Sequence, residues 1–167
     1  MTGSPDDLAP PTADRGIDPR GPRVGAGITA ALLVGVLLLG GAPVAALVLL
    51  SVVAASFLLG AVRGPQGTWQ GALFKAVVRP RLAPPTELED PRPPTFAQLV
   101  GLVITGAGVL LGLLGVGPAV PVAAGLALVA AFLNSAFGLC LGCELYLLGL
   151  RLRARVGTAT GGPGGAR

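Results

Sequence analysis

The sequence predicts an all-α integral membrane protein with four transmembrane helices in two helical hairpins, joined by a Pro-rich connector that holds a short interfacial helix. Of the 167 residues, 52% are hydrophobic and only 12% are charged. Soluble domains carry about 25% charged residues, so this chain could not cover a core with polar surface. No charged side chain occurs in residues 24–62 or 93–143, and each stretch exceeds the roughly 20 residues that one span needs. Each stretch is therefore expected to cross the membrane more than once.

Turn residues divide each apolar stretch into two spans. Residues 40–43 (GGAP) interrupt the first stretch and residues 115–118 (GVGP) interrupt the second, because glycine and proline break helices. The predicted spans are 24–39, 44–62, 96–114 and 119–150, within a transmembrane domain of residues 24–155. The last span would be about 48 Å long as one helix, too long for the hydrocarbon core, so we expect a break at Gly138.

The basic residues predict the orientation of the spans. All twelve Lys and Arg residues lie in segments 15–23, 63–92 and 151–167, which share one side of a four-span protein. The positive-inside rule then places both termini in the cytoplasm. The net charge of +4 does not indicate a nucleic-acid partner, because the basic residues flank apolar spans without interleaved aromatic side chains. The absence of histidine excludes a Ser-His-Asp triad and a histidine-type metal site.

Three segments lie outside the predicted spans. Residues 1–23 and 156–167 are rich in small and turn-forming residues, and we expect both to be disordered cytoplasmic tails. In the cytoplasmic connector 63–95, residues 68–79 predict a short helix with Trp69 and Leu73 on its apolar face. This helix is expected either to lie in the membrane interface or to pack beneath the hairpins. The prolines that follow favour extended chain, which presents three acidic residues to a partner: Glu87, Glu89 and Asp90.

Small side chains recur along one face of the third span and one face of the fourth. In the third span they are Gly101, Thr105, Gly108, Gly112 and Gly115. In the fourth they are Ser135, Gly138, Gly142 and Gly149. Small residues spaced three and four positions apart let two helix backbones approach closely in lipid. We therefore expect the two faces to pack against each other within the second hairpin.

Both cysteines of the chain lie in one motif, Cys140-Leu141-Gly142-Cys143, which is followed by Glu144. At a separation of three residues on a helix, the two side chains are within reach of a disulfide. Glu144 is four residues from Cys140 and so on the same face, where a carboxylate in an apolar environment could accept the proton released when a thiolate forms. One interpretation is therefore a redox pair, with Cys140, Cys143 and Glu144 as candidate catalytic residues.

Two other interpretations of the motif stay open. The cysteines are packing residues if they behave as small apolar side chains and Glu144 pairs with Arg151 or Arg153 at the headgroup boundary. A metal site is the third interpretation, but two thiolates and one carboxylate leave a zinc site incomplete. We therefore expect no metal and no cofactor.

Two stretches carry a family resemblance: RPRLAPPTELEDPRPPTFAQLVG at residues 79–101 and FGLCLGCELYLL at residues 137–148. They resemble a bacterial membrane-protein family, common in actinobacteria, that is catalogued as domain of unknown function 4395, and the likeness extends over about residues 20–155. The resemblance implies a four-helix protein of the bacterial plasma membrane, with thioredoxin-like and rhodanese-like proteins often encoded nearby. The residues that match the family's connector and cysteine motif are Glu87, Glu89, Asp90, Phe96, Cys140, Cys143 and Glu144.

The cysteine motif and the connector favour different functions. In the first, Cys140 and Cys143 exchange electrons or sulfane sulfur with a cytoplasmic thioredoxin-like or rhodanese-like protein, as a thiol-disulfide or sulfur-relay component. In the second, the protein is a non-enzymatic membrane scaffold or small-solute carrier with structural cysteines. Its acidic connector and basic edges would then bind a cytoplasmic protein or anionic lipid. The lipid bilayer is a partner under both functions.

Overall fold

The computed structural model describes residues 16–85 and 87–160, and this part of the chain is helical apart from turns and one isolated β-bridge. The long helices are α1 Arg20–Leu38, α2 Pro43–Arg63, α4 Arg92–Leu113, α5 Ala119–Phe137 and α6 Leu141–Thr160. The short helical segments are η2 Leu39–Gly41, η3 Pro65–Gly67, α3 Trp69–Leu73, η4 Phe74–Val78 and η5 Arg79–Arg81. The predicted all-α class is confirmed.

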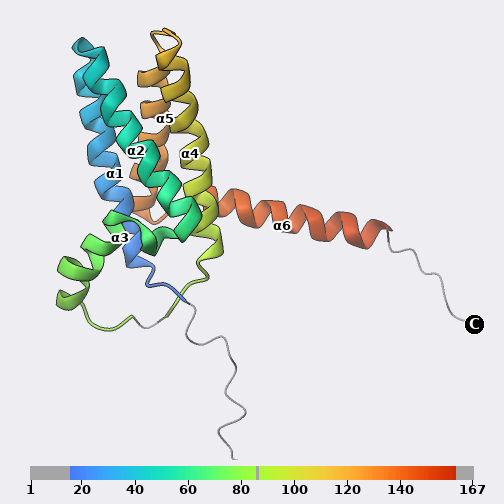
Figure 1. Cartoon of the computed structure of the whole chain (residues 1–167). Helices are drawn as coiled ribbons and strands as arrows, with labels where there is room; N and C mark the ends of the chain where they lie inside the picture. The colour runs from blue at the N-terminus through green and yellow to red at the C-terminus, as the bar shows by residue number, and fades with distance from the viewer. Residues whose placement is uncertain (1–15, 86, 161–167) are drawn as a thin grey trace, which may run out of the picture.

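Helices α1, α2, α4 and α5 lie side by side in a bundle (Figure 1). Each is long and apolar enough to cross a membrane, in agreement with the four predicted spans. Along the bundle, α1 packs mainly on α5 and α2 mainly on α4, while α4 also contacts α5. The η2 turn and the 114–118 turn lie together at one end, and the opposite end carries the start of α1, the end of α2 and the start of α4 (Figure 1).

The bundle has a core of small and medium side chains and an apolar outer surface. The core residues are Leu33, Val36, Ala46, Leu50, Val53, Ala123, Ala124, Ala127 and Ala131. Large apolar side chains also face outward along the whole bundle, among them Val44, Leu110 and Val122, which are 74%, 64% and 57% exposed. Soluble monomeric proteins rarely expose continuous apolar surface of this extent.

Helices α1 and α4 begin earlier than the predicted spans, and their first turns include prolines. Pro22 lies in the first turn of α1, and Pro93 is among the first residues of α4. Proline fits there because the first N–H groups of a helix have no intrahelical partner. Residues 17–23 therefore differ from the predicted disordered tail, since Ile17 is buried and α1 starts at Arg20. Residues 1–15 of that tail lie outside the described residues.

The predicted span 119–150 is divided into two helices. Helix α5 ends at Phe137, and Gly138 adopts a left-handed conformation with φ of 70°. The Gly138 N–H donates to the carbonyl of Asn134 at 3.0 Å, which closes the end of α5 in the way that glycine caps commonly do. Helix α6 then leaves sideways from the bundle (Figure 1). The expected break at Gly138 is present, and α6 extends to Thr160, beyond the predicted start of the C-terminal tail at residue 156. Residues 161–167 lie outside the described residues.

The predicted connector helix is a short α-turn followed by π and 3-10 turns. Thr68 caps α3, since its hydroxyl oxygen accepts a hydrogen bond from the Gly71 N–H at 3.1 Å. The side of α3 and η4 that faces the protein carries Gln70, Gly71 and Phe74, which are buried. The predicted apolar face points outward, because Trp69, Leu73 and Val77 are each more than two-fifths exposed.

Candidate dithiol site

The end of α5 and the start of α6 place the cysteine motif just outside the bundle. The Cys140 carbonyl accepts a hydrogen bond from the Glu144 N–H at 3.0 Å, which makes Cys140 the N-cap residue of α6. The Cys140 Sγ atom accepts a second hydrogen bond from the Cys143 N–H at 3.3 Å. Cys140 thus occupies the position in which Ser or Thr commonly satisfies the free N–H groups of a first helical turn.

Cys140 and Cys143 form a disulfide, with their Cα atoms 5.2 Å apart. This separation lies within the usual range for disulfides. Both residues are partly buried, so neither is sealed in the protein core.

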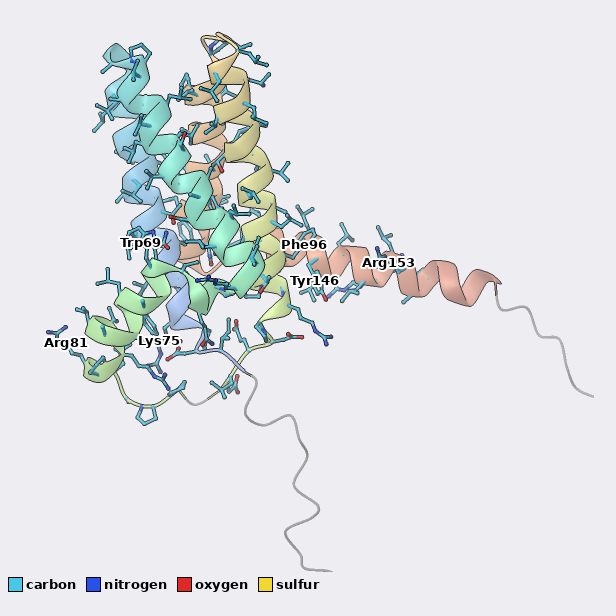
Figure 2. The ribbon with its side chains drawn as sticks, viewed as in Figure 1. Trp69, Lys75, Arg81, Phe96, Tyr146 and Arg153 are labelled. Atoms are coloured by element: carbon cyan, nitrogen blue, oxygen red, sulfur yellow. A yellow bond between two sulfur atoms is a disulfide. The ribbon has the colours of Figure 1, made fainter. Side chains whose placement is uncertain are left out.

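Two contacts fix the start of α6 against α4. Gly142 packs so closely on α4 that an added Cβ atom would lie 2.6 Å from Ala97 Cβ. One turn later, the rings of Tyr146 and Phe96, both labelled in Figure 2, meet with their centroids 5.7 Å apart. Gly142 was predicted to face the third span, and it does so. The cysteine pair therefore lies at the corner where the start of α6 packs on α4.

Glu144 is exposed and lies in the first turn of α6. A carboxylate at this position is stabilised by the helix dipole, so its location also has a structural reason. Within the described residues no ion pair joins Glu144 to Arg151 or Arg153, in contrast to the pairing expected for a purely structural motif. No group of three or more Cys, Asp or Glu side chains in the described chain could hold a metal ion.

The acidic connector is tied to the start of the described chain. Ile17 and Glu89 pair through two backbone hydrogen bonds of 2.9 Å, and Asp90 Oδ1 accepts one from the Arg92 N–H at 2.9 Å. Asp90 therefore has a structural role at the start of α4, which the sequence did not indicate. The side chains of Glu87 and Glu89 are exposed, as expected for residues available to a partner.

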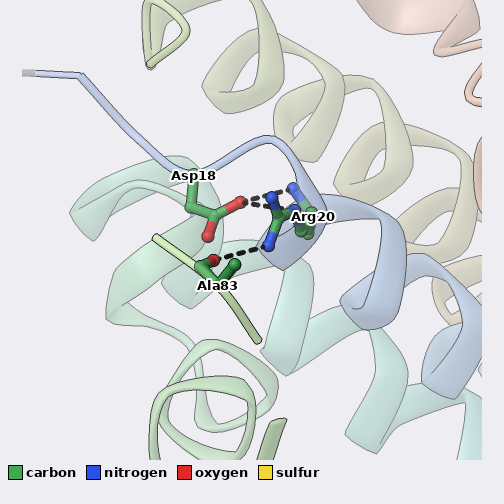
Figure 3. Close-up of polar contacts among 3 residues, drawn as sticks. All are labelled: Asp18, Arg20 and Ala83. Carbon is green, nitrogen blue, oxygen red and sulfur yellow. Dashed lines mark hydrogen bonds and ion pairs between the residues drawn. The ribbon is translucent and has the colours of Figure 1, made fainter. Parts of the chain in front are cut away.

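The contact between the connector and α1 is polar (Figure 3). Asp18 Oδ1 accepts a hydrogen bond from the Arg20 N–H at 3.0 Å and lies 4.0 Å from Arg20 Nε. The Arg20 guanidinium also donates to the Ala83 carbonyl at 3.0 Å. These bonds hold the connector beneath the start of α1.

Sequence reasoning missed a pocket beside this contact. Its volume is about 250 Å³, and its lining includes Asp18, Phe74, Lys75, Arg79 and Leu88. These residues come from the start of the described chain, the η4 and η5 segments and the connector. No local pattern could have brought them together, because the pocket depends on contacts between segments that are distant in sequence.

The small-residue face of α4 packs on α5, which forms the first part of the predicted fourth span, and also on α2, which was not predicted. An added Cβ atom at Gly101 would lie 2.7 Å from Phe57 Cδ1 of α2, and one at Gly112 would lie 2.8 Å from Val120 Cγ2 of α5. Gly108 faces Ala123, which like Val120 lies in the N-terminal half of α5.

The remaining members of the two predicted faces have other surroundings. Thr105 is fully buried, and its hydroxyl donates to the Gly101 carbonyl at 2.7 Å. Gly115 has a φ of 82°, and added Cβ atoms at Gly115 and Gly149 would meet nothing within 4 Å. Ser135 faces Gly27 of α1. The small-residue face of α4 thus approaches its neighbours closely, and those neighbours are both α2 and α5. Ser135, from the other predicted face, does not contact it.

The comparisons with known proteins identify one family. The family model described as Domain of unknown function (DUF4395) matches residues 17–151. The matched region begins at Ile17, which pairs with Glu89, and it includes the bundle, the connector and the cysteine motif. No curated protein and no solved structure matches the chain.

Proposed function

The chain belongs to the family described as Domain of unknown function (DUF4395), and from that premise we propose a membrane protein that exchanges disulfides with a soluble thioredoxin-like protein. Cys140 and Cys143 are the exchanging residues. The observation that carries the proposal is their placement, since both lie at the start of α6, outside the bundle and joined to each other. Cysteines that serve only as packing residues have no need of this position.

The apolar outer surface supports insertion of the bundle in a bilayer. Four helices of suitable length expose large apolar side chains along their sides. At the end where α1 starts, α3 turns Trp69 and Leu73 outward, as expected for a helix in the headgroup region. The basic residues outside the spans favour the cytoplasm for this end, and therefore for the cysteine pair.

The exchange itself transfers two electrons. A thiolate of the partner attacks one sulfur of the Cys140–Cys143 disulfide, whose S–S bond breaks as a mixed disulfide forms. The second thiol of the partner then attacks the mixed disulfide and leaves the partner oxidised. Cys140 and Cys143 have gained two electrons and two protons, both supplied by the partner dithiol. The reverse reaction with a partner disulfide restores the starting pair.

The surroundings of the two sulfur atoms favour Cys140 as the residue that forms the mixed disulfide. The Cys143 N–H already donates to Cys140 Sγ, and the free N–H groups at the start of α6 favour a negative charge there. Glu144 lies in the same first turn of α6 and is exposed, so it is the carboxylate available to take up or return the proton. Transfer of sulfane sulfur from a rhodanese-like partner would use the same Cys140 thiolate as acceptor.

The first test measures the redox state of the pair in intact membranes. Free thiols are alkylated with a reagent that adds mass, before and after an oxidant, and then after addition of reduced thioredoxin. We expect both cysteines of a molecule to convert together between the disulfide, which the reagent does not alkylate, and two free thiols, which it does. Two thiols that never oxidise, and react only after detergent unfolds the protein, would overturn the proposal.

The second test traps the partner. The Cys143→Ser variant lacks the residue that resolves a mixed disulfide, so we expect Cys140 to retain a thioredoxin-like or rhodanese-like protein on a non-reducing gel. The matched Cys140→Ser variant should retain at least tenfold less. Equal trapping by both variants would contradict the assigned role of Cys140. Trapping by neither would contradict exchange with a protein partner.

The exposed connector carboxylates favour a second candidate function, that of a membrane scaffold. Glu87 and Glu89 are exposed, and the backbone of Glu89 is fixed by Ile17. Charge reversal in the Glu87→Lys and Glu89→Lys double variant leaves the Asp90 cap intact. If the scaffold function is correct, this variant loses crosslinked partners that a Cys140→Ser variant keeps.

A further inference from the structure

Helix α6 is an element with little support from the rest of the protein. It has 20 residues, and its contacts with α4 lie near its start, at Gly142 and Tyr146. Beyond that point it projects sideways, with Arg153 well clear of the bundle (Figure 2). It is also not among the four helices that are apolar enough to cross a membrane. A helix of this kind needs a surface that covers it.

One face of α6 is a continuous apolar stripe. Its members are Leu141, Leu145, Leu148 and Leu152, which are 40%, 54%, 51% and 53% exposed. Their spacing of four, three and four residues places them along one side of a helix. At 100° per residue, Cys143 falls on the side opposite this leucine stripe.

Basic residues follow the apolar part of the helix. Arg151, Arg153 and Arg155 alternate with apolar residues, and Glu144 is the only acidic residue of α6. At 100° per residue, Arg151 and Arg153 lie on opposite sides of the leucine stripe, each roughly a quarter of a turn from it, which suits a helix that lies with its leucines on acyl chains and its arginines among anionic headgroups.

We propose that α6 lies in the membrane interface and binds anionic phospholipid, with the leucine stripe on the acyl chains and the arginines among the headgroups. The inference rests on the proposed insertion of the bundle, because α6 extends across the direction of the four long helices and so along the bilayer surface (Figure 1). Arginines on both sides of the stripe favour an anionic surface as the occupant over a second copy of the same basic helix.

A pocket at the root of α6 supports a lipid as the occupant. It has a volume of about 420 Å³ and is lined mainly by apolar atoms, from residues that include Ala61, Phe96, Leu99 and Tyr146. Arg92 is also part of the lining. Apolar walls with one arginine fit an acyl chain below an anionic headgroup.

The orientation has a consequence for the cysteine pair. When the leucine stripe faces the acyl chains, Cys143 on the opposite side of α6 faces the water. The disulfide is then presented at the membrane surface to a soluble protein. Lipid binding by α6 therefore positions the disulfide for exchange with a soluble partner.

The test compares two leucines of α6 that are almost equally exposed in the protein alone, Leu148 at 51% and Leu150 at 46%. Leu148 belongs to the stripe and Leu150 lies opposite it. In the full chain with Cys140→Ser and Cys143→Ser, Leu148→Cys or Leu150→Cys carries a nitroxide label in vesicles of anionic lipid. We expect oxygen, which concentrates in lipid, to relax the label at 148 more strongly, and a water-soluble nickel complex to relax the label at 150.

Two controls separate the possible failures. A label at Val103→Cys, in the middle of α4 and at a position that is 62% exposed, reports insertion of the bundle and should be accessible to oxygen alone. If 103 behaves in this way while 148 and 150 are alike, α6 is not in the interface, although the bundle is inserted. Dipolar broadening between labels at 148 would identify a second copy as the occupant and overturn the proposal. The redox chemistry does not affect these results, because both native cysteines are replaced.

The arginines are tested by changing lipid and charge together. Each basic residue near an anionic surface contributes about fivefold to binding. The label at 148 divides between a population in lipid and a population in water. In anionic vesicles, Arg151→Gln and Arg153→Gln should each lower the ratio of the lipid population to the water population by about fivefold. In zwitterionic vesicles they should leave this ratio unchanged. Arg81→Gln, on η5, should have no effect. Equal ratios in both lipids for the unsubstituted helix would overturn the requirement for anionic lipid.

Discussion

At the scale of single residues, the glycines of α4 have different surroundings although they share one helix. A Cβ atom added at Gly108 would overlap that of Ala123 on α5, and one added at Gly112 would lie 2.8 Å from Val120 Cγ2. A Cβ atom added at Gly106 would meet nothing within 4 Å. The close approach of α4 and α5 therefore depends on Gly108 and Gly112 and not on Gly106.

This difference predicts opposite effects of the same substitution. Gly108→Ala forces α4 and α5 apart and should lower the free energy of unfolding by about 1–3 kcal/mol. Gly106→Ala should raise it by up to about 1 kcal/mol, because alanine favours the helical backbone. Denaturation of both variants in mixed detergent micelles measures the difference. Equal stability of the two variants would show that the helices do not pack as described.

Some site residues could be predicted from local sequence and others could not. Cys140 and Cys143 are three residues apart, so spacing alone predicted that a disulfide is within reach, although it did not distinguish a disulfide from two packing residues. The hydrogen bond from the Arg92 N–H to Asp90 was not predicted, because we assigned the prolines after Asp90 to extended chain and not to a first helical turn. The pairing of Ile17 with Glu89 joins segments that are distant in sequence, and no short motif encodes it.

At the scale of elements, Gly138 separates α5 from α6. Its φ of 70° costs an L-residue about 1–2 kcal/mol, whereas an added Cβ atom would make only an ordinary contact with Arg23. Gly138→Ala should therefore lower the free energy of unfolding by about 1 kcal/mol through the backbone alone. Gly125→Ala, inside α5 and facing open space, should not. Thermal unfolding of both variants is the measurement, and a stabilised Gly138→Ala protein would contradict the turn.

The short helix α3 is joined to α2 by a hydrogen bond between side chains. Trp69 Nε1 donates to Ser56 Oγ at 2.8 Å, and Ser56 is buried. Trp69→Phe keeps an aromatic ring and removes the donor, so the free energy of unfolding should fall by about 0.5–1.5 kcal/mol. A double-mutant cycle with Ser56→Ala isolates this bond. Additive effects of the two substitutions would mean that the bond contributes nothing.

Helix ends were predictable where a short Gly/Pro turn sets them, and less predictable elsewhere. The GGAP and GVGP turns limit α2 and α5 close to their predicted starts. The start of α4 was placed too late because the prolines before residue 96 were assigned to extended chain, and the start of α1 because the span was begun after the last charged residue, Arg23. The small face of α4 meets α5, within the predicted fourth span, but it also meets α2. The contact with α2 was not predicted, because spacing along one helix does not reveal every neighbour of a face.

At the scale of the whole molecule, charge is distributed unequally between the two ends of the bundle. Arg20, Arg63 and Arg92 lie at or near the end where α1 starts, and Lys75 extends from the same end (Figure 2). The two turns at the other end contain no charged residue. This asymmetry is the physical basis for an orientation, since basic loops stay on the cytoplasmic side.

The orientation predicts which positions an impermeant thiol reagent can reach from outside the cell. In a chain without Cys140 and Cys143, cysteines at Gly40 and Gly117 should react at once, because both lie in the uncharged turns and have open space for a side chain. Cysteines at Gln66 and Leu82, at the basic end and also exposed, should react only after the membrane is permeabilised. The reverse pattern would place Cys140 and Cys143 on the outer face. Their partner would then be a disulfide-forming protein of an oxidising compartment, because a reducing cytoplasm holds such a pair as thiols.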